Sequence, residues 1–185
     1  MVETDKLQAP PRLSPFWRFS LKFYAMPGVP AACLDLQDRA GADVNLLLFA
    51  LFLARQGRRL GAADMGSLSG ATEDWRAQAV SPLRSVRRFL KAPPPAFANE
   101  ATAALRERLK GIELEAERLQ QEALFGLRPL SQWGVEALAS AETAAANVAA
   151  YEAMLGLAFE ARPVANLLTA LASMPPPGGV PAGEM

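Results

Sequence analysis

Four oxygen-bearing side chains stand close together near residue 40, where they could bind a metal ion or a small molecule. Asp35, Asp38, Asp43 and Asn45 fall in the single stretch LDLQDRAGADVN. Carboxylate and amide oxygens suit Mg²⁺ or Mn²⁺. One hypothesis is therefore a helical enzyme or small-ligand binder that uses Asp35, Asp38 and Asn45.

The spacing of these residues favours a structural role instead. Asp35 and Asp38 share a helical face at i, i+3, but Asp43 is placed to cap the following helix. No second acidic motif recurs with comparable spacing. We therefore assign no catalytic residue, metal ligand or cofactor, and keep Asp35, Asp38 and Asn45 as candidate ligand-binding residues.

A second set of residues could contact another molecule through charge. The segment SPLRSVRRFLK repeats basic side chains along one helical face, namely Arg84, Arg87, Arg88 and Lys91. Guanidinium groups bind carboxylates and phosphates through paired hydrogen bonds. These four residues are our candidates for binding an acidic protein partner.

The uneven charge along the chain leaves a second interpretation open. Residues 12–91 hold 12 Lys/Arg against 6 Asp/Glu, whereas residues 92–162 hold 6 against 10. The arginine face could thus be neutralised within the chain, by the helix that carries Glu113, Glu115 and Glu117. Because the formal net charge is zero, we favour an acidic protein or a second copy of the chain over nucleic acid.

The composition is typical of one soluble globular domain of 185 residues, 51% hydrophobic and 21% charged. It has no histidine and one cysteine, which excludes Ser/His/Asp catalysis and an internal disulfide. We expect Cys33 to be a small buried apolar residue. The N-terminal segment lacks the apolar core of a signal peptide, and the longest apolar run is about half a membrane span. We therefore expect a cytoplasmic protein with no membrane segment.

The segments that carry these residues are all predicted to be helices. We expect a single helical domain over residues 14–172, flanked by an N-terminal arm at 1–13 and a Pro/Gly-rich tail at 173–185 that are both disordered. Ser14 followed by Pro15 begins the first helix, and Gly41 ends the second. Asp43 begins the third, LLLFALFLA, which is apolar on every side and is expected to form a buried centre covered by the aromatic first helix and the arginine helix.

The second half predicts a long antiparallel hairpin. GAADMGSLSGA is expected to be a loop before a helix that Thr72 caps. Because Pro82 disfavours helical geometry at Ser81, we expect either two helices or one strongly kinked helix there. Residues 99–125 form the longest helix, with a seam of period 3.5: Leu105, Leu109, Ile112, Ala116, Leu119 and Ala123. An alanine-rich stripe over residues 141–158 is expected to pack against this seam, and a last helix covers 163–172. No strand is expected.

The segments FWRFSL, PGVPAACLDLQD and DVNLLLF resemble a family of short, mostly proteobacterial proteins, catalogued as a domain of unknown function. The resemblance implies an all-helical cytoplasmic fold and supplies no catalytic residues. Our leading hypothesis is a non-enzymatic interaction module that contacts an acidic partner, or itself, through the arginine helix. The ligand-binding hypothesis stands beside it.

Overall fold

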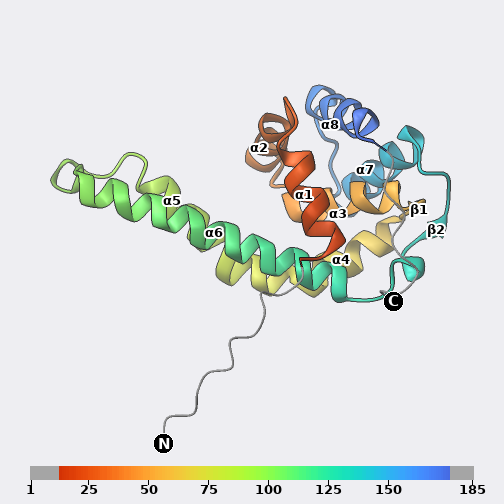
Figure 1. Cartoon of the computed structure of the whole chain (residues 1–185), viewed down its shortest axis with the longest axis horizontal. Helices are drawn as coiled ribbons and strands as arrows, with labels where there is room; N and C mark the ends of the chain where they lie inside the picture. The colour runs from red at the N-terminus through yellow and green to blue at the C-terminus, as the bar shows by residue number, and fades with distance from the viewer. Residues whose placement is uncertain (1–12, 176–185) are drawn as a thin grey trace, which may run out of the picture.

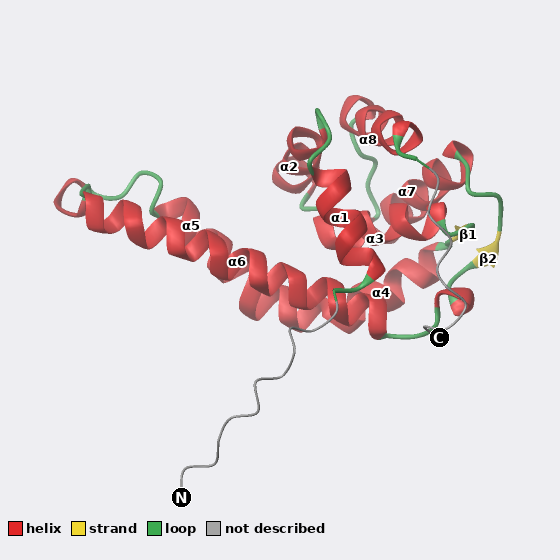
Figure 2. Ribbon diagram, in the orientation of Figure 1, coloured by secondary structure: helices red, strands yellow, loops and turns green. Residues whose placement is uncertain are grey.

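A computed structural model describes residues 13–175 of the chain, and these are mostly helical, as the sequence predicts (Figure 2). The helices are α1 (Pro15–Tyr24), α2 (Val29–Ala40), α3 (Val44–Arg55), α4 (Ala62–Trp75), α5 (Ser81–Phe89), α6 (Glu100–Gly126), α7 (Ala141–Leu155) and α8 (Ala161–Ser173). A five-residue π-helix, Arg76–Val80, joins α4 to α5. The expected arm and tail at the two termini lie almost wholly outside the described residues.

The buried central helix is confirmed. Every residue of α3 from Asn45 to Ala54 is buried. Asp43 begins the helix, because its Oδ1 accepts the Asn45 N–H at 2.8 Å and compensates a backbone donor that lacks a helical partner. Helices α1, α2, α4, α6 and α7 pack around α3, so the aromatic first helix covers it as expected, but the arginine helix α5 packs on α6 instead. Phe16 of α1 meets Phe49 of α3 edge-on, with ring centroids 4.8 Å apart.

The first helix begins, and the second ends, where the caps predict. The Ser14 hydroxyl accepts the Trp17 N–H at 3.0 Å. Gly41 ends α2 with a φ of 66°, a left-handed conformation that costs glycine little because it has no Cβ. Cys33 is fully buried, as expected.

The expected loop over residues 61–71 is wrong, because this segment is most of α4. The Asp64 side chain accepts the Gly61 N–H and starts the helix. Met65, Leu68 and Thr72 then share one buried face at helical spacing. The Thr72 hydroxyl donates to the Leu68 carbonyl inside the helix, so it caps nothing. Burial of this face outweighs the weak helix propensity of the glycines and serines.

The expected non-helical geometry of Ser81 is also wrong, since Ser81 is helical with φ −65° and ψ −42°. The π-helix explains how Pro82 is accommodated. The Ser81 N–H bonds to the Arg76 carbonyl, five residues back, so the hydrogen-bond register shifts just before the proline. Helix α5 therefore continues α4 as one long limb.

A long antiparallel helical hairpin exists, but α6 pairs with α4 and α5 and not with α7, the helix that we expected. Helix α6 runs antiparallel to α4 and α5, because Thr72 of α4 contacts Gln120 whereas Arg87 of α5 contacts Glu113. Figure 1 shows α5 and the N-terminal half of α6 projecting from the other helices as an arm. Helix α7 instead packs on α3 and α4. Its stripe of Ala144, Val148 and Tyr151 is buried as predicted, but against different helices.

A two-stranded antiparallel sheet, which we did not expect, places α7 beside α3. Strand β1 (Arg58–Arg59) follows α3, and β2 (Val135–Glu136) lies in the connection between α6 and α7. Gly134 precedes β2 with a φ of 52°, and a Cβ there would lie 2.1 Å from the Arg59 carbonyl oxygen. Two-residue strands are too short to show a period of two in the sequence.

Candidate functional site

The predicted arginine face lies mainly against α6. Arg84 is 3.3 Å from Glu113 and 2.7 Å from Glu117, and Arg87 also pairs with Glu113. Glu113 is buried, and each of the two arginines keeps about a fifth of its side chain exposed. The geometry therefore matches the interpretation in which this face is neutralised within the chain, and binding of an acidic partner stays a prediction.

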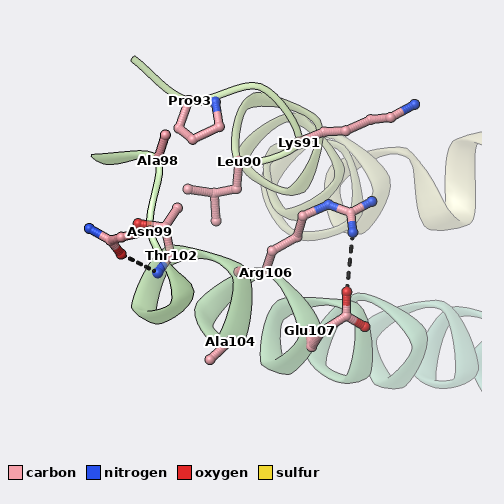
Figure 3. Close-up of a pocket in the computed structure, with 10 residues that line it drawn as sticks. Leu90, Lys91, Pro93, Ala98, Asn99, Thr102, Ala104, Arg106 and Glu107 are labelled. Atoms are coloured by element: carbon pink, nitrogen blue, oxygen red, sulfur yellow. Dashed lines mark hydrogen bonds and ion pairs between the residues drawn. The ribbon is translucent and has the colours of Figure 1, made fainter. Parts of the chain in front are cut away.

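Arg88 and Lys91, the other two predicted partner-binding residues, are more accessible. Arg88 pairs with Asp38 of α2, and about half of each side chain is exposed. Lys91 lines a cavity of about 420 Å³ at the tip of the arm, together with Leu90 and Pro93, and its side chain extends away from them (Figure 3). Of the four basic residues, these two leave the most charge at the surface.

The candidate ligand-binding residues do not converge on one point. Asp35 forms an ion pair with Arg39 at 2.8 Å on the surface of α2, and Asp38 contacts Arg88. Asn45 instead lies buried at the start of α3. Within residues 13–175, no group of three or more cysteine or acidic side chains has an arrangement that could hold a metal ion.

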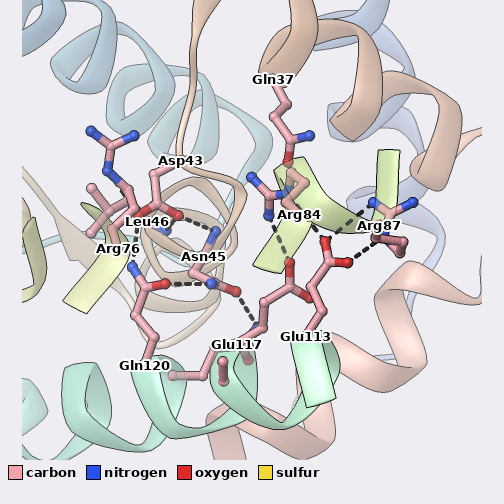
Figure 4. A network of polar contacts seen from close by, with 12 residues as sticks. Gln37, Asp43, Asn45, Leu46, Arg76, Arg84, Arg87, Glu113, Glu117 and Gln120 are labelled. Carbon is pink, nitrogen blue, oxygen red and sulfur yellow. Dashed lines mark hydrogen bonds and ion pairs between the residues drawn. The ribbon is translucent and has the colours of Figure 1, made fainter. Parts of the chain in front are cut away.

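Asn45 belongs to a buried chain of side-chain amides that links α3 to α6 (Figure 4). Gln120 Nε2 donates to Asp43 Oδ2 at 2.7 Å, and Asn45 Nδ2 donates to Gln120 Oε1 at 2.7 Å. Gln121 Nε2 then donates to Asn45 Oδ1 at 2.8 Å. We call Asp43, Gln120, Asn45 and Gln121 the amide relay. It fixes how the long helix docks on the central one.

Burial controls the ionisation of Asp43 at the head of the relay. Loss of solvent raises the pKa of the Asp43 carboxyl above its usual value. The hydrogen bonds from Gln120 and Asn45 and the charge of Arg76, 4.0 Å away, act in the opposite direction. Burial likewise raises the pKa of the Tyr151 hydroxyl, which accepts the Asp43 N–H at 2.7 Å. Both groups serve structural hydrogen bonds here.

Sequence reasoning missed Gln120 and Gln121, because they sit among charged residues on a helix that was assigned a different buried face. Their adjacency was the available signal, since two neighbouring uncharged amides stand between charged residues in ERLQQE. Tyr151 was assigned to an apolar stripe, and its hydroxyl contact with Asp43 depends on the position of α7.

A pocket of about 720 Å³ lies between α1, α2 and α3 on one side and α5 and α6 on the other. Asn45 and Gln121 of the amide relay line it, and so do Arg84 and Arg87. Apolar side chains make up much of the remaining wall, namely Trp17, Leu21, Tyr24, Leu34, Val44, Leu48 and Leu114. We call this the interhelical pocket. The predicted seam residues do not line it.

The predicted seam of α6 is largely exposed, which corrects our expectation that a second helix covers it. Ile112 keeps 54% of its surface accessible, and Leu105 and Leu119 are similarly exposed. Of the predicted seam residues only Ala116 is buried, on a face of α6 that it shares with Glu113, Gln120, Gln121 and Leu124. On α5, Phe89 is 59% exposed, and no residue of that helix is fully buried.

The fold and the site thus define an all-helical protein with a projecting arm and an interhelical pocket. The chain belongs to the family described as "protein of unknown function (DUF2390)", whose model matches residues 15–124, more than half of the sequence. This confirms the resemblance seen in the sequence. No curated protein and no solved structure matches the chain. In the described part of the chain, none of the helices is long and apolar enough to cross a membrane.

Proposed function

We propose that the protein is a non-enzymatic helical interaction module that pairs with a second copy of itself through the arm. The observation that carries this proposal is the exposed row of Leu105, Ile112 and Leu119, spaced seven residues apart along α6. A heptad repeat of apolar residues is typical of a helix that packs against another helix along its length. In the described monomer no helix covers this row.

Both arm helices contribute to the same exposed face. We call the helices outside the arm, α1 to α4, α7 and α8, the body. Ile112 lies on the side of α6 opposite Gln121, which contacts Asn45 of the body. Val86 lies on the side of α5 opposite Arg88, which contacts Asp38 of the body. The row of α6 and the exposed Val86 of α5 therefore both face away from the body. Two such hairpins packed face to face would form a four-helix bundle.

The charges beside the row favour a second copy in an antiparallel orientation. Arg108 and Glu115 flank Ile112 on the same side of the row, one basic and one acidic, and Glu115 also pairs with Arg118 of its own helix at 2.6 Å. A two-fold axis near Ile112 would place Arg108 of one copy beside Glu115 of the other, twice per dimer. An antiparallel pair would also stack Leu105 on Leu119 across the axis.

Binding of an acidic protein through the arginine helix is the rival proposal, and less supports it. Arg84 and Arg87 already have carboxylate partners in Glu113 and Glu117. An acidic partner would have to displace these groups, or use only the accessible Arg88 and Lys91. Since exposed ion pairs contribute little, such a contact would be weak without an apolar centre.

Measurement of the mass in solution tests the proposal. We expect light scattering of the full chain to give a concentration-dependent mass that approaches twice 19.8 kDa. Ile112→Glu places a charge at the centre of the paired rows, so this variant should stay monomeric with unchanged helicity. Leu138→Glu is the matched control, because Leu138 is 83% exposed and lies outside the arm.

A charge exchange tests the orientation. Arg108→Glu and Glu115→Arg should each weaken the dimer, because each creates like-charged contacts across the two-fold axis. The double variant should recover most of the wild-type affinity. A wild-type chain that remains monomeric up to high micromolar concentration, or a dimer that Ile112→Glu leaves intact, contradicts self-association through the arm.

A further inference from the structure

The interhelical pocket has the size and the wall of a small-molecule site. Its volume of about 720 Å³ falls within the usual range for such sites, roughly 300–1,000 Å³. Its lining comes from α1, α2 and α3 on one side and from α5 and α6 on the other, so the pocket lies at a junction between separate helices. Apolar side chains from α1, α2, α3 and α6 supply most of the wall, which suits an apolar ligand body.

The polar part of the lining contains two oxygens without partners. Ser20 and Gln121 both line the pocket, and each is only 3% exposed. Within the described part of the chain, neither Ser20 Oγ nor Gln121 Oε1 has a hydrogen-bond partner. A buried oxygen without a donor is unfavourable, and such groups are uncommon in folded proteins.

The amide relay determines the hydrogen-bonding character of Gln121. Asp43 uses Oδ1 for the Asn45 and Leu46 N–H groups and Oδ2 for Gln120, so the carboxylate only accepts. This orients the amide of Gln120, which in turn orients Asn45 and then Gln121. The Gln121 nitrogen donates one of its two N–H groups to Asn45 Oδ1. The relay therefore ends in an oxygen, Gln121 Oε1, which needs a donor.

The charges around the pocket nearly cancel. Arg84 and Arg87 face Glu113 and Glu117, and Lys110 pairs with Glu107 at 2.7 Å. A strongly charged ligand would have to break these pairs. An uncharged ligand leaves them intact.

From this geometry we infer that the interhelical pocket binds a small, uncharged, mainly apolar molecule that donates one O–H or N–H hydrogen bond to Gln121 Oε1. Ser20 is a second polar contact, because its hydroxyl can accept or donate. The inference is independent of self-association, since the pocket lies on the body side of the arm and the apolar rows on the opposite side.

N-phenyl-1-naphthylamine is a suitable probe, because it is uncharged and apolar, carries one N–H and becomes brighter in an apolar environment. We expect saturable binding to the full chain in a fluorescence titration. The N-methyl derivative lacks the donor and should bind about threefold to tenfold more weakly, the range for one net hydrogen bond. In Gln121→Met the two probes should bind equally. The ratio of the two dissociation constants is the readout, because partial unfolding would weaken both probes alike.

A second pair of variants tests the location. Leu34 lies in the pocket wall and is 45% exposed, so Leu34→Trp should obstruct the pocket without disturbing the core and should weaken both probes. Leu138→Trp adds the same side chain outside the pocket and should change neither. Absence of saturable binding, or equal effects of the two tryptophan variants, overturns the site. Equal affinity of the two probes for the wild-type chain overturns the donor requirement.

Discussion

At the scale of single residues, the polar entrance to α3 organises packing. Asp43 caps the helix. The Asn45 side chain donates a hydrogen bond to Gln120 and accepts one from Gln121, both on α6. Each bond joins groups that have lost access to water, so the network favours one docking position of α6 over any shifted one. A slip of α6 by one residue would leave at least one amide without a partner.

Asn45→Ala should therefore destabilise the protein strongly. The change leaves Gln120 Oε1 and the Gln121 amide without their bonds, and each unsatisfied buried group costs about 1–3 kcal/mol. We expect the free energy of unfolding to fall by about 2–5 kcal/mol in urea denaturation. Gln78→Ala, on the exposed face of the π-helix, should change it by less than about 0.5 kcal/mol. A similar small loss for Asn45→Ala would show that the relay does not hold the helices together.

At the scale of elements, ion pairs hold α5 to α6. Helix α5 has no fully buried residue, so apolar packing alone attaches it weakly. Glu113 is buried between Arg84 and Arg87, where a single carboxylate serves two guanidinium groups. The basic and acidic segments of the sequence thus attract one another across this pair of helices, which was one of the two interpretations of the charge pattern.

Glu113→Gln should loosen the arm. Loss of the carboxylate leaves Arg87 without its partner, while Arg84 keeps Glu117. We expect the free energy of unfolding to fall by about 1–2 kcal/mol, less than for a fully buried pair because the arginines retain solvent contact. Hydrogen exchange should increase first in α5. Glu107→Gln removes an exposed carboxylate on the same helix and should leave the unfolding midpoint unchanged. Equal exchange in both variants would show that the ion pairs do not attach α5.

At the scale of the whole molecule, the small sheet links the two halves of the chain. Strand β1 follows the central helix and β2 precedes α7, so their pairing places α7 against α3. The Asn147 side chain of α7 strengthens the junction, because its amide bonds to the Ala50 and Arg58 carbonyls and its oxygen accepts the Leu60 N–H. The arm is left to project on the other side of the molecule (Figure 1).

Gly134→Ala should weaken this junction. A Cβ at Gly134 would meet the Arg59 backbone at 2.1 Å, and a φ of 52° is itself unfavourable for alanine. We expect a loss of at least about 1–3 kcal/mol in the free energy of unfolding. Gly111→Ala, inside α6 with open space around it, should instead stabilise the chain by about 0.5–1 kcal/mol. A neutral Gly134→Ala would indicate that the sheet is dispensable.

The sequence by itself determined the helical class, the caps at Ser14 and Asp43, the glycine end at Gly41 and the buried centre of α3. These features depend on neighbours along the chain, since a cap contacts backbone groups within three residues and a helix that is apolar on every side must be buried.

Only the tertiary structure decided which helix covers each helical face. Helical periodicity shows that Leu105, Ile112 and Leu119 form a row, but it does not say which helix meets that row, and burial of Met65 and Leu68 turned an expected loop into α4. The site residues followed the same division: Asn45 was recognised from its position, whereas Gln120, Gln121 and the interhelical pocket depend on where α6 docks, which is set by contacts between residues more than seventy positions apart.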